Sequence, residues 1–283
     1  MKKYLLLSVL AFALVLGGCQ QKNEAEKSNQ ESQDIENKEE KSDKETKGDL
    51  HTEITVSAAA SLTDALGELK ELYEKENQDV NIIYNFGASG TLQNQIEEGA
   101  EVDIFFSAAQ KQMKALIESG FVDEKDSSNL LRNEVVLITT KKKNDLNIES
   151  FEDLTKDEVK MIALGEPGGV PVGQYSEEIL NYFNIADDIK SKVSYGSDVR
   201  QVLTWVVSGQ AEAGLVYKTD ALIEQDNVNI IASAPVESHK PVIYPVAVLK
   251  ESKHRQEAEK FIDFLNTDEV ISIFEKYGFV KAD

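Results

Sequence analysis

Four short turns contain the residue types that could bind an anion. In each turn an apolar run ends in small or polar residues and a helical pattern begins; the turns span 58–64 (AAASLTD), 86–92 (FGASGTL), 165–173 (GEPGGVPVG) and 196–200 (GSDVR). Helix N-termini expose unpaired N–H groups and the positive end of the helix dipole, so several of them together could hold an anion without a charged side chain. Ser61 and Ser89 would add hydroxyl donors.

Each turn also has an ordinary structural explanation. A serine at a helix start is often an N-cap worth about 1 kcal/mol, and Ser61 followed by Asp64 matches a capping box. The glycine-rich stretch can be a plain turn, and Tyr217 at the end of the apolar run 213–217 can be a packed aromatic with its hydroxyl at the surface. From these residues alone, an oxyanion or nucleotide site is one possibility beside simple capping.

The composition excludes several other kinds of chemistry. The chain of 283 residues has one cysteine and three histidines, too few for a disulfide framework, a cysteine-rich zinc site or a Cys/His nucleophile pair. Its 51 Asp and Glu against 30 Lys and Arg give a formal charge of −21, which argues against binding to nucleic acid. Because no nucleophile or general acid/base motif is visible, we expect a protein that is not an enzyme.

Strands and helices alternate along the chain and would position the four turns. Apolar runs predict strands at 54–59, 80–84, 102–107, 134–140, 160–164, 213–217, 229–233 and 242–249. Helical spacing predicts helices at 62–73, 91–98, 108–119, 174–183, 199–208, 255–265 and 267–277. This alternation predicts an α/β architecture with mostly parallel sheets covered on both faces. It does not locate a boundary between domains.

The N-terminal segment has the pattern of an export signal. Lys2 and Lys3 precede an apolar run at 4–16 that is too short to span a membrane, and Leu-Gly-Gly-Cys ends at Cys19. This pattern resembles a bacterial lipoprotein signal, which implies a signal peptide at 1–18 and acylation of Cys19; an ordinary signal with an incidental cysteine is the alternative. The polar residues 19–51 predict a disordered tether on the membrane surface.

Seven motifs together resemble the periplasmic molybdate-binding proteins of ABC importers. The resemblance extends over residues 52–283. The motifs, in chain order, are AAASLTDA at 58–65, ASGTL at 88–92 with QIE at 95–97, VDIFFSA at 102–108, GEP at 165–167 with VPVGQY at 170–175, GLVY at 214–217, YPVAV at 244–248 and YGF at 277–279.

The resemblance implies a two-lobed α/β periplasmic-binding-protein fold of type II, with two interlobe crossings and a ligand cleft. It implies one lobe at 52–133 and 236–283 and another at 134–235. The implied ligand residues are Ser61, Ser89, Val172, Val199 and Tyr217, the serines and the tyrosine through hydroxyls and the valines through backbone N–H groups. This chain departs from the family in having Val172 where a smaller residue is common and Gly90 where serine is frequent.

The implied ligand is molybdate and, with the same donors, tungstate. A proton-free dianion needs donors only, so we expect no Asp or Glu to face the ligand, with Asp64 and Asp198 making other bonds. Closure of the lobes would strengthen the bonds to the ligand. The implied protein is a monomeric, membrane-anchored lipoprotein on the extracytoplasmic face that serves an ABC permease, has no cofactor and offers no direct ligands to a metal cation.

Several alternatives stay open at this point. The protein could instead be specific for tungstate, the first alternative, or bind sulfate or phosphate, although phosphate keeps a proton and favours a carboxylate acceptor. An enzyme on the same fold and a lipid-anchored sensor or adhesion domain are alternatives from other classes. Ferric-ion binding is disfavoured because no adjacent tyrosines occur in the expected cleft.

Overall fold

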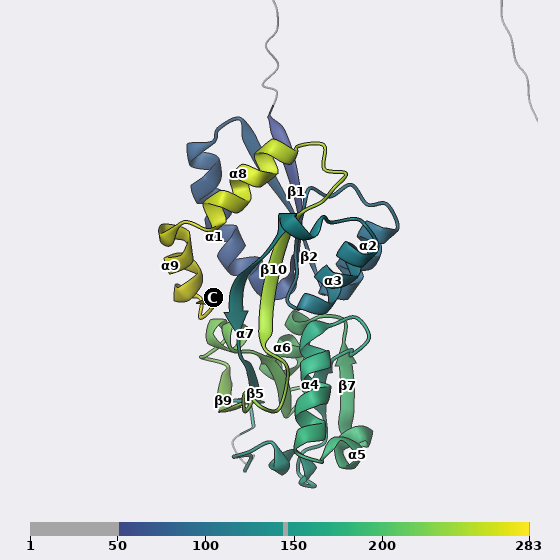
Figure 1. Cartoon of the computed structure of the whole chain (residues 1–283). Coiled ribbons are helices and arrows are strands. Elements are labelled where there is room, and N and C mark those ends of the chain that lie inside the picture. The colour runs from purple at the N-terminus through teal and green to yellow at the C-terminus, as the bar shows by residue number, and fades with distance from the viewer. Residues whose placement is uncertain (1–50, 144–146, 283) are drawn as a thin grey trace, which may run out of the picture. The chain divides into compact units, whose positions relative to one another are not determined.

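The computed structural model describes residues 51–143 and 147–282, which form two α/β lobes, each built on one sheet (Figure 1). The predicted signal peptide, Cys19 and nearly all of the tether lie outside the described residues. None of the helices described is long and apolar enough to cross a membrane.

The first lobe carries a six-stranded sheet in the order β11-β4-β10-β3-β1-β2. Its elements are β1 Thr52–Ala59, the 3-10 helix η1 Ala60–Leu62, α1 Thr63–Glu76, β2 Val80–Gly87, α2 Ser89–Glu97, β3 Ile104–Phe106, α3 Gln110–Glu118, η2 Glu124–Asp126, β4 Ser127–Asn133, β10 Val242–Val248, α8 Arg255–Leu265, α9 Asp268–Lys276 and β11 Val280–Lys281. The side chains of β3 alternate between two apolar clusters: Ile104 and Phe106 join the large core, and Phe105 packs with residues of α2 and α3. Helices therefore cover both faces of this sheet.

The second lobe carries a five-stranded sheet in the order β7-β6-β8-β5-β9. Its elements are β5 Val135–Thr140, η3 Glu152–Thr155, β6 Ile162–Gly165, α4 Pro171–Tyr182, α5 Ala186–Ile189, η4 Lys190–Lys192, β7 Val193–Gly196, α6 Val199–Val207, β8 Ala213–Tyr217, α7 Lys218–Ile223 and β9 Val228–Ser233. The chain enters this sheet between Asn133 and Val135 and leaves it between Ser233 and Val242.

The expectation of mostly parallel sheets is wrong, because both sheets are mixed. β1 pairs in parallel with β2 and β3, and β6 pairs in parallel with β7 and β8. β10 is antiparallel to β3 and β4, and β5 is antiparallel to β8 and β9. The strands that lead into or out of the two passages between the lobes all take part in antiparallel pairs; they are β4, β5, β9 and β10. Sequence periodicity also missed the strands β4 and β11 and the short helices α5 and α7, and it marked β7 only through the turn at 196–200.

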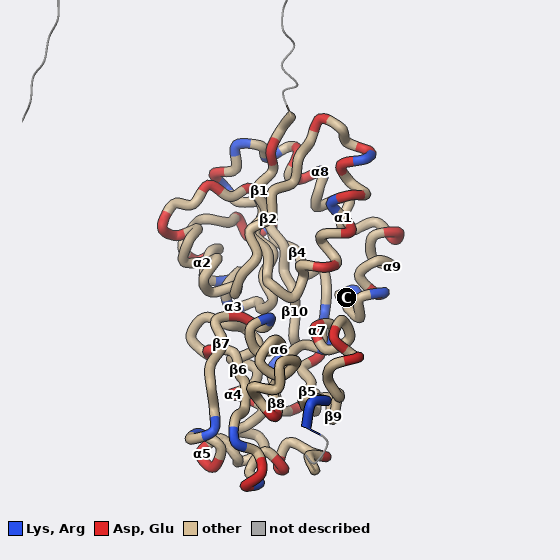
Figure 2. Tube along the Cα trace, turned by 180° about the vertical axis from the view of Figure 1, so that it is seen from behind, with Lys and Arg blue, Asp and Glu red and all other residues tan. Residues whose placement is uncertain are grey.

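Asp and Glu residues occur in both lobes, with Lys and Arg residues among them along the chain trace (Figure 2). The negative charge of the described residues is therefore not confined to one lobe.

Candidate functional site

The five predicted ligand residues surround one small cavity between the lobes. Within each lobe, neighbouring parallel strands end side by side, with Ala59 opposite Gly87 and Gly165 opposite Gly196. The four predicted turns therefore meet at one place. The cavity is lined by Ala59, Ala60, Ser61, Gly87, Ala88, Ser89, Ala108, Val170, Pro171, Val172, Asp198, Val199 and Tyr217. The cavity has a volume of about 10 Å³, which is too small for an organic molecule.

Two helices of the second lobe begin at the cavity wall. Pro171 and Val172 open α4, and Val199 is the first residue of α6. The N–H groups of Val172 and Val199 have no acceptor inside their own helices at these positions. The Asp198 carboxylate caps α6 by accepting from the Gln201 N–H at 2.9 Å. The side chain of Asp198 is thus engaged in capping, and the helix starts present donors to the cavity.

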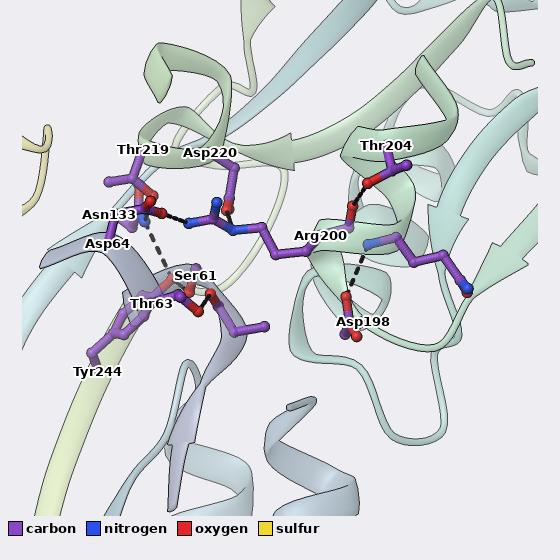
Figure 3. Close-up of polar contacts among 12 residues, drawn as sticks. Ser61, Thr63, Asp64, Asn133, Asp198, Arg200, Thr204, Thr219, Asp220 and Tyr244 are labelled. Atoms are coloured by element: carbon purple, nitrogen blue, oxygen red, sulfur yellow. Dashed lines mark hydrogen bonds and ion pairs between the residues drawn. The ribbon is translucent and has the colours of Figure 1, made fainter. Parts of the chain in front are cut away.

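A chain of hydrogen bonds orients the Ser61 hydroxyl (Figure 3). Asn133 Oδ1 accepts from the Glu134 N–H at 2.9 Å, which fixes the amide so that its Nδ2 donates to the Tyr244 hydroxyl at 3.2 Å. The Tyr244 hydroxyl lies 2.8 Å from Ser61 Oγ. Either hydroxyl can be the donor in this pair; in the arrangement in which Tyr244 donates, the Ser61 proton is available to a ligand.

Ser89 and Tyr217 supply two more hydroxyl donors. Ser89 Oγ accepts from the Ala108 N–H at 3.0 Å, so its own proton is free to point elsewhere. Tyr217 is buried, and its hydroxyl has no hydrogen-bond partner among the residues that the structure describes. Burial raises the pKa of Tyr217 well above its usual value of 10.0, so the hydroxyl stays protonated at neutral pH. A buried, unpaired donor beside a cavity indicates a ligand that accepts.

The capping explanation for the two serines is wrong. α1 begins at Thr63 and α2 at Ser89, and neither N-cap makes a side-chain hydrogen bond to its helix. The Asp64 carboxylate accepts from Arg200 and does not line the cavity. The sequence analysis missed Asn133 and Tyr244, which orient Ser61; Tyr244 lies in a motif that carried the family resemblance, whereas nothing in the local pattern marks Asn133.

The charges of a larger cavity do not suit an anion. It measures about 490 Å³ and lies at the opposite ends of β1 and β3, where Glu53, Glu101, Asp103 and Glu251 outnumber Lys253, which pairs with Glu101. The Asp103 carboxylate beside it already accepts from the Thr55 N–H and the Ser252 hydroxyl. Among the described residues, no group of three or more His, Cys, Asp and Glu could hold a metal ion.

The arrangement as a whole is that of a donor-lined cleft, and comparison with known proteins assigns its family. The model of the bacterial extracellular solute-binding proteins matches residues 54–280. The chain belongs to this family. Members bind solutes and are not enzymes, which confirms the prediction of a binding protein.

Individual relatives agree with the family assignment. The chain is 43% identical over 279 residues to a putative ABC transporter substrate-binding lipoprotein, YvgL, of Bacillus subtilis, with 98% of each chain covered. It is 38% identical over 229 residues to the molybdate-binding protein ModA of Haemophilus influenzae, covering 80% of this chain and 89% of that one. A solved substrate-binding domain of a putative molybdenum ABC transporter from Clostridium difficile is 40% identical with a TM-score of 0.63, covering 82% of this chain and all of that one. The predicted resemblance and the two-lobed fold are thus confirmed.

Proposed function

We propose that this protein captures molybdate, and also tungstate, and delivers it to an ABC importer. The observation that carries the proposal is the set of groups around one small cavity that can donate hydrogen bonds: the hydroxyls of Ser61, Ser89 and Tyr217, and the first N–H groups of α4 and α6. The chain's relatives among molybdate-binding proteins support the same ligand.

Molybdate and tungstate carry no proton at neutral pH, so every oxygen accepts hydrogen bonds. Phosphate retains a proton and favours an acceptor, yet Asp198, whose carboxylate caps α6, is the sole Asp or Glu among the residues lining this cavity. Sulfate is also proton-free, so discrimination against it depends on size: donors spaced for the longer bonds of molybdate cannot all reach a smaller ion.

Each ligand residue has a proposed role. Ser61, Ser89 and Tyr217 donate hydroxyl protons, and Val172 and Val199 donate backbone N–H groups from helix starts. Charge-assisted hydrogen bonds of this kind are about twice as strong as neutral ones, and the helix dipoles add favourable potential without a counter-ion. The metal of the oxyanion is held only through its oxygens.

The remaining parts of the proposal concern where the protein works. We propose that the signal peptide at 1–18 is removed, that lipid on Cys19 anchors the protein at the outer face of the cell membrane, and that residues 20–51 act as a spacer. We also propose that the lobes comprise 52–133 with 236–283 and 134–235, and that the protein is a monomer that docks on a membrane permease. The lipoprotein relative supports the anchor.

Calorimetric titration of the full-length chain in detergent with molybdate, tungstate, sulfate and phosphate tests the proposed function. We expect tight binding of molybdate and tungstate and binding weaker by at least about 100-fold for sulfate and phosphate, which corresponds to about 2.7 kcal/mol. Sulfate or phosphate binding as tightly as molybdate would refute the assignment.

A further inference from the structure

An arginine bridges the two lobes beside the cavity. Arg200, in the first turn of α6 in the second lobe, donates from one terminal nitrogen to Asp64 Oδ2 at 2.5 Å. Asp64 lies in the first turn of α1 in the first lobe. The Nε of the same guanidinium lies 2.7 Å from Asp220 Oδ1 on α7 (Figure 3). One side chain therefore pairs with a carboxylate of each lobe.

The two carboxylates differ in burial, and this gives them different roles. The Asp220 side chain is 0% exposed and belongs to the same lobe as Arg200, whereas the Asp64 side chain is 38% exposed and belongs to the other lobe. When the lobes separate, the Asp64 pair must break while the Asp220 pair can persist. Asp220 thus holds the guanidinium in place, which reduces the side-chain entropy lost when the lobes close on Asp64.

The bridge lies next to the ligand donors without touching the cavity. Val199 lines the cavity and Arg200 follows it directly, but Arg200, Asp64 and Asp220 are not among the lining residues. Because its guanidinium pairs with the Asp64 carboxylate and its Nε lies against Asp220, Arg200 contributes no net positive charge to the site. Any effect of Asp64 on the ligand must therefore act through the position of the lobes or through the carboxylate's own repulsion of an anion.

We propose that Arg200 is a positioning residue that holds the lobes closed through Asp64 and so slows the release of the bound oxyanion. The identity of that ligand rests on the proposed function, whereas the closure role does not. A partly exposed, hydrogen-bonded ion pair contributes modestly, so its loss should speed release of the ligand by about threefold to tenfold.

The test uses the full-length chain in detergent and three variants. Asp64→Ala removes the interlobe pair and leaves Arg200 with Asp220. Asp64→Glu keeps the charge and serves as the conservative rescue. Glu71→Ala is the matched control, because it removes one carboxylate from an exposed position of the same helix. The dissociation rate of molybdate is measured by chasing with excess tungstate.

A second measurement follows closure without depending on the ligand's identity. The Gly90 N–H in the first lobe donates to the Gly169 carbonyl at 2.9 Å in the second lobe, so hydrogen exchange at Gly90 reports separation of the lobes. We expect Asp64→Ala to speed both molybdate release and Gly90 exchange relative to Glu71→Ala, and Asp64→Glu to restore both in part. The melting temperature of each variant shows whether the substitution also changes the stability of α1.

The outcomes separate the two proposals. If Asp64 acted only by repelling the anion, Asp64→Ala would bind molybdate more tightly, and this result would overturn the closure role. Equal Gly90 exchange in Asp64→Ala and Glu71→Ala, with and without molybdate, would overturn it as well. If the wild-type chain binds no molybdate, the proposed function fails, while faster Gly90 exchange in Asp64→Ala still supports the role of Arg200.

Discussion

Gly90 should control whether the cleft can close. Its N–H donates across the cleft to Gly169, and no side chain separates the two backbones. A Cβ added at Gly90 would lie 2.4 Å from the Gly169 carbonyl oxygen, 2.7 Å from its Cα and 2.9 Å from its carbonyl carbon. All three atoms are backbone, so no rotamer change relieves the clash. Gly90→Ala should therefore keep the lobes apart.

The size of the effect follows from these distances. A normal C···O contact of about 3.3 Å requires the two backbones to separate by roughly 1 Å. A separation of that size stretches charge-assisted hydrogen bonds from one lobe beyond their useful range of about 2.7–2.9 Å. The loss of two such bonds, each worth about 1.5–3 kcal/mol, predicts molybdate binding at least about 100-fold weaker.

Gly90→Ala should not destabilise the ligand-free protein, although it weakens molybdate binding. Gly90 lies in the first turn of α2, where alanine stabilises a helix by about 0.5–1 kcal/mol relative to glycine. Gly67→Ala is the matched control, because Gly67 lies inside α1 and a Cβ there would meet nothing within 4 Å. Calorimetry should show intact molybdate binding in Gly67→Ala and loss of it in Gly90→Ala, with neither ligand-free melting temperature reduced.

Two results would refute this reasoning. Wild-type affinity in Gly90→Ala would mean that closure does not bring Gly90 against Gly169. A large drop in the ligand-free melting temperature would mean that Gly90 supports the fold itself. Gly90→Ser also adds a Cβ, so it should weaken binding as Gly90→Ala does.

Three further predictions follow from the site. Tyr217→Phe should weaken molybdate binding by about tenfold to 100-fold, measured by calorimetry, without lowering the ligand-free melting temperature, because the hydroxyl has no partner among the described residues. Val199→Pro removes the N–H donor at a helix position that accepts proline, after the extended Asp198 (φ −159°, ψ 175°). Val199→Pro should weaken molybdate binding, whereas Val199→Ala, which keeps the N–H, should not. Equal affinities of these two variants for molybdate would exclude this N–H as a ligand. Burial raises the pKa of Asp220 from 3.8 to about 7, so the native state holds a proton that the unfolded state has released between these values. The free energy of unfolding should therefore fall as pH rises through that window, by at most about 1.4 kcal/mol per pH unit, and urea titrations of Asp220→Asn should show a flatter profile than those of wild type.

Much of the site could be predicted from the sequence because its signals are local. An apolar run that ends in small residues before a helical pattern marks a strand–helix turn, and all four such turns occur in the structure. The ligand residues that the family resemblance implied were Ser61, Ser89, Val172, Val199 and Tyr217, which all line one cavity. Mixed strand direction was not predictable, because periodicity reports which face a residue occupies and not which way its neighbour runs.

The sequence by itself determined the class of chemistry: donors at helix starts, one cysteine in a lipoprotein-like signal, and too few histidines and cysteines for catalysis or a zinc site. The tertiary structure decided which distant groups meet. Ser61 and Tyr244, both in the first lobe, are 183 residues apart in sequence, and Asp64 and Arg200, in different lobes, are 136 apart. Local patterns encode helix starts and strand faces, whereas contacts over such separations depend on how the strands of a lobe assemble and on how the two lobes close. The orientation of Ser61, the role of Arg200 and the need for glycine at position 90 therefore emerged only from the folded chain.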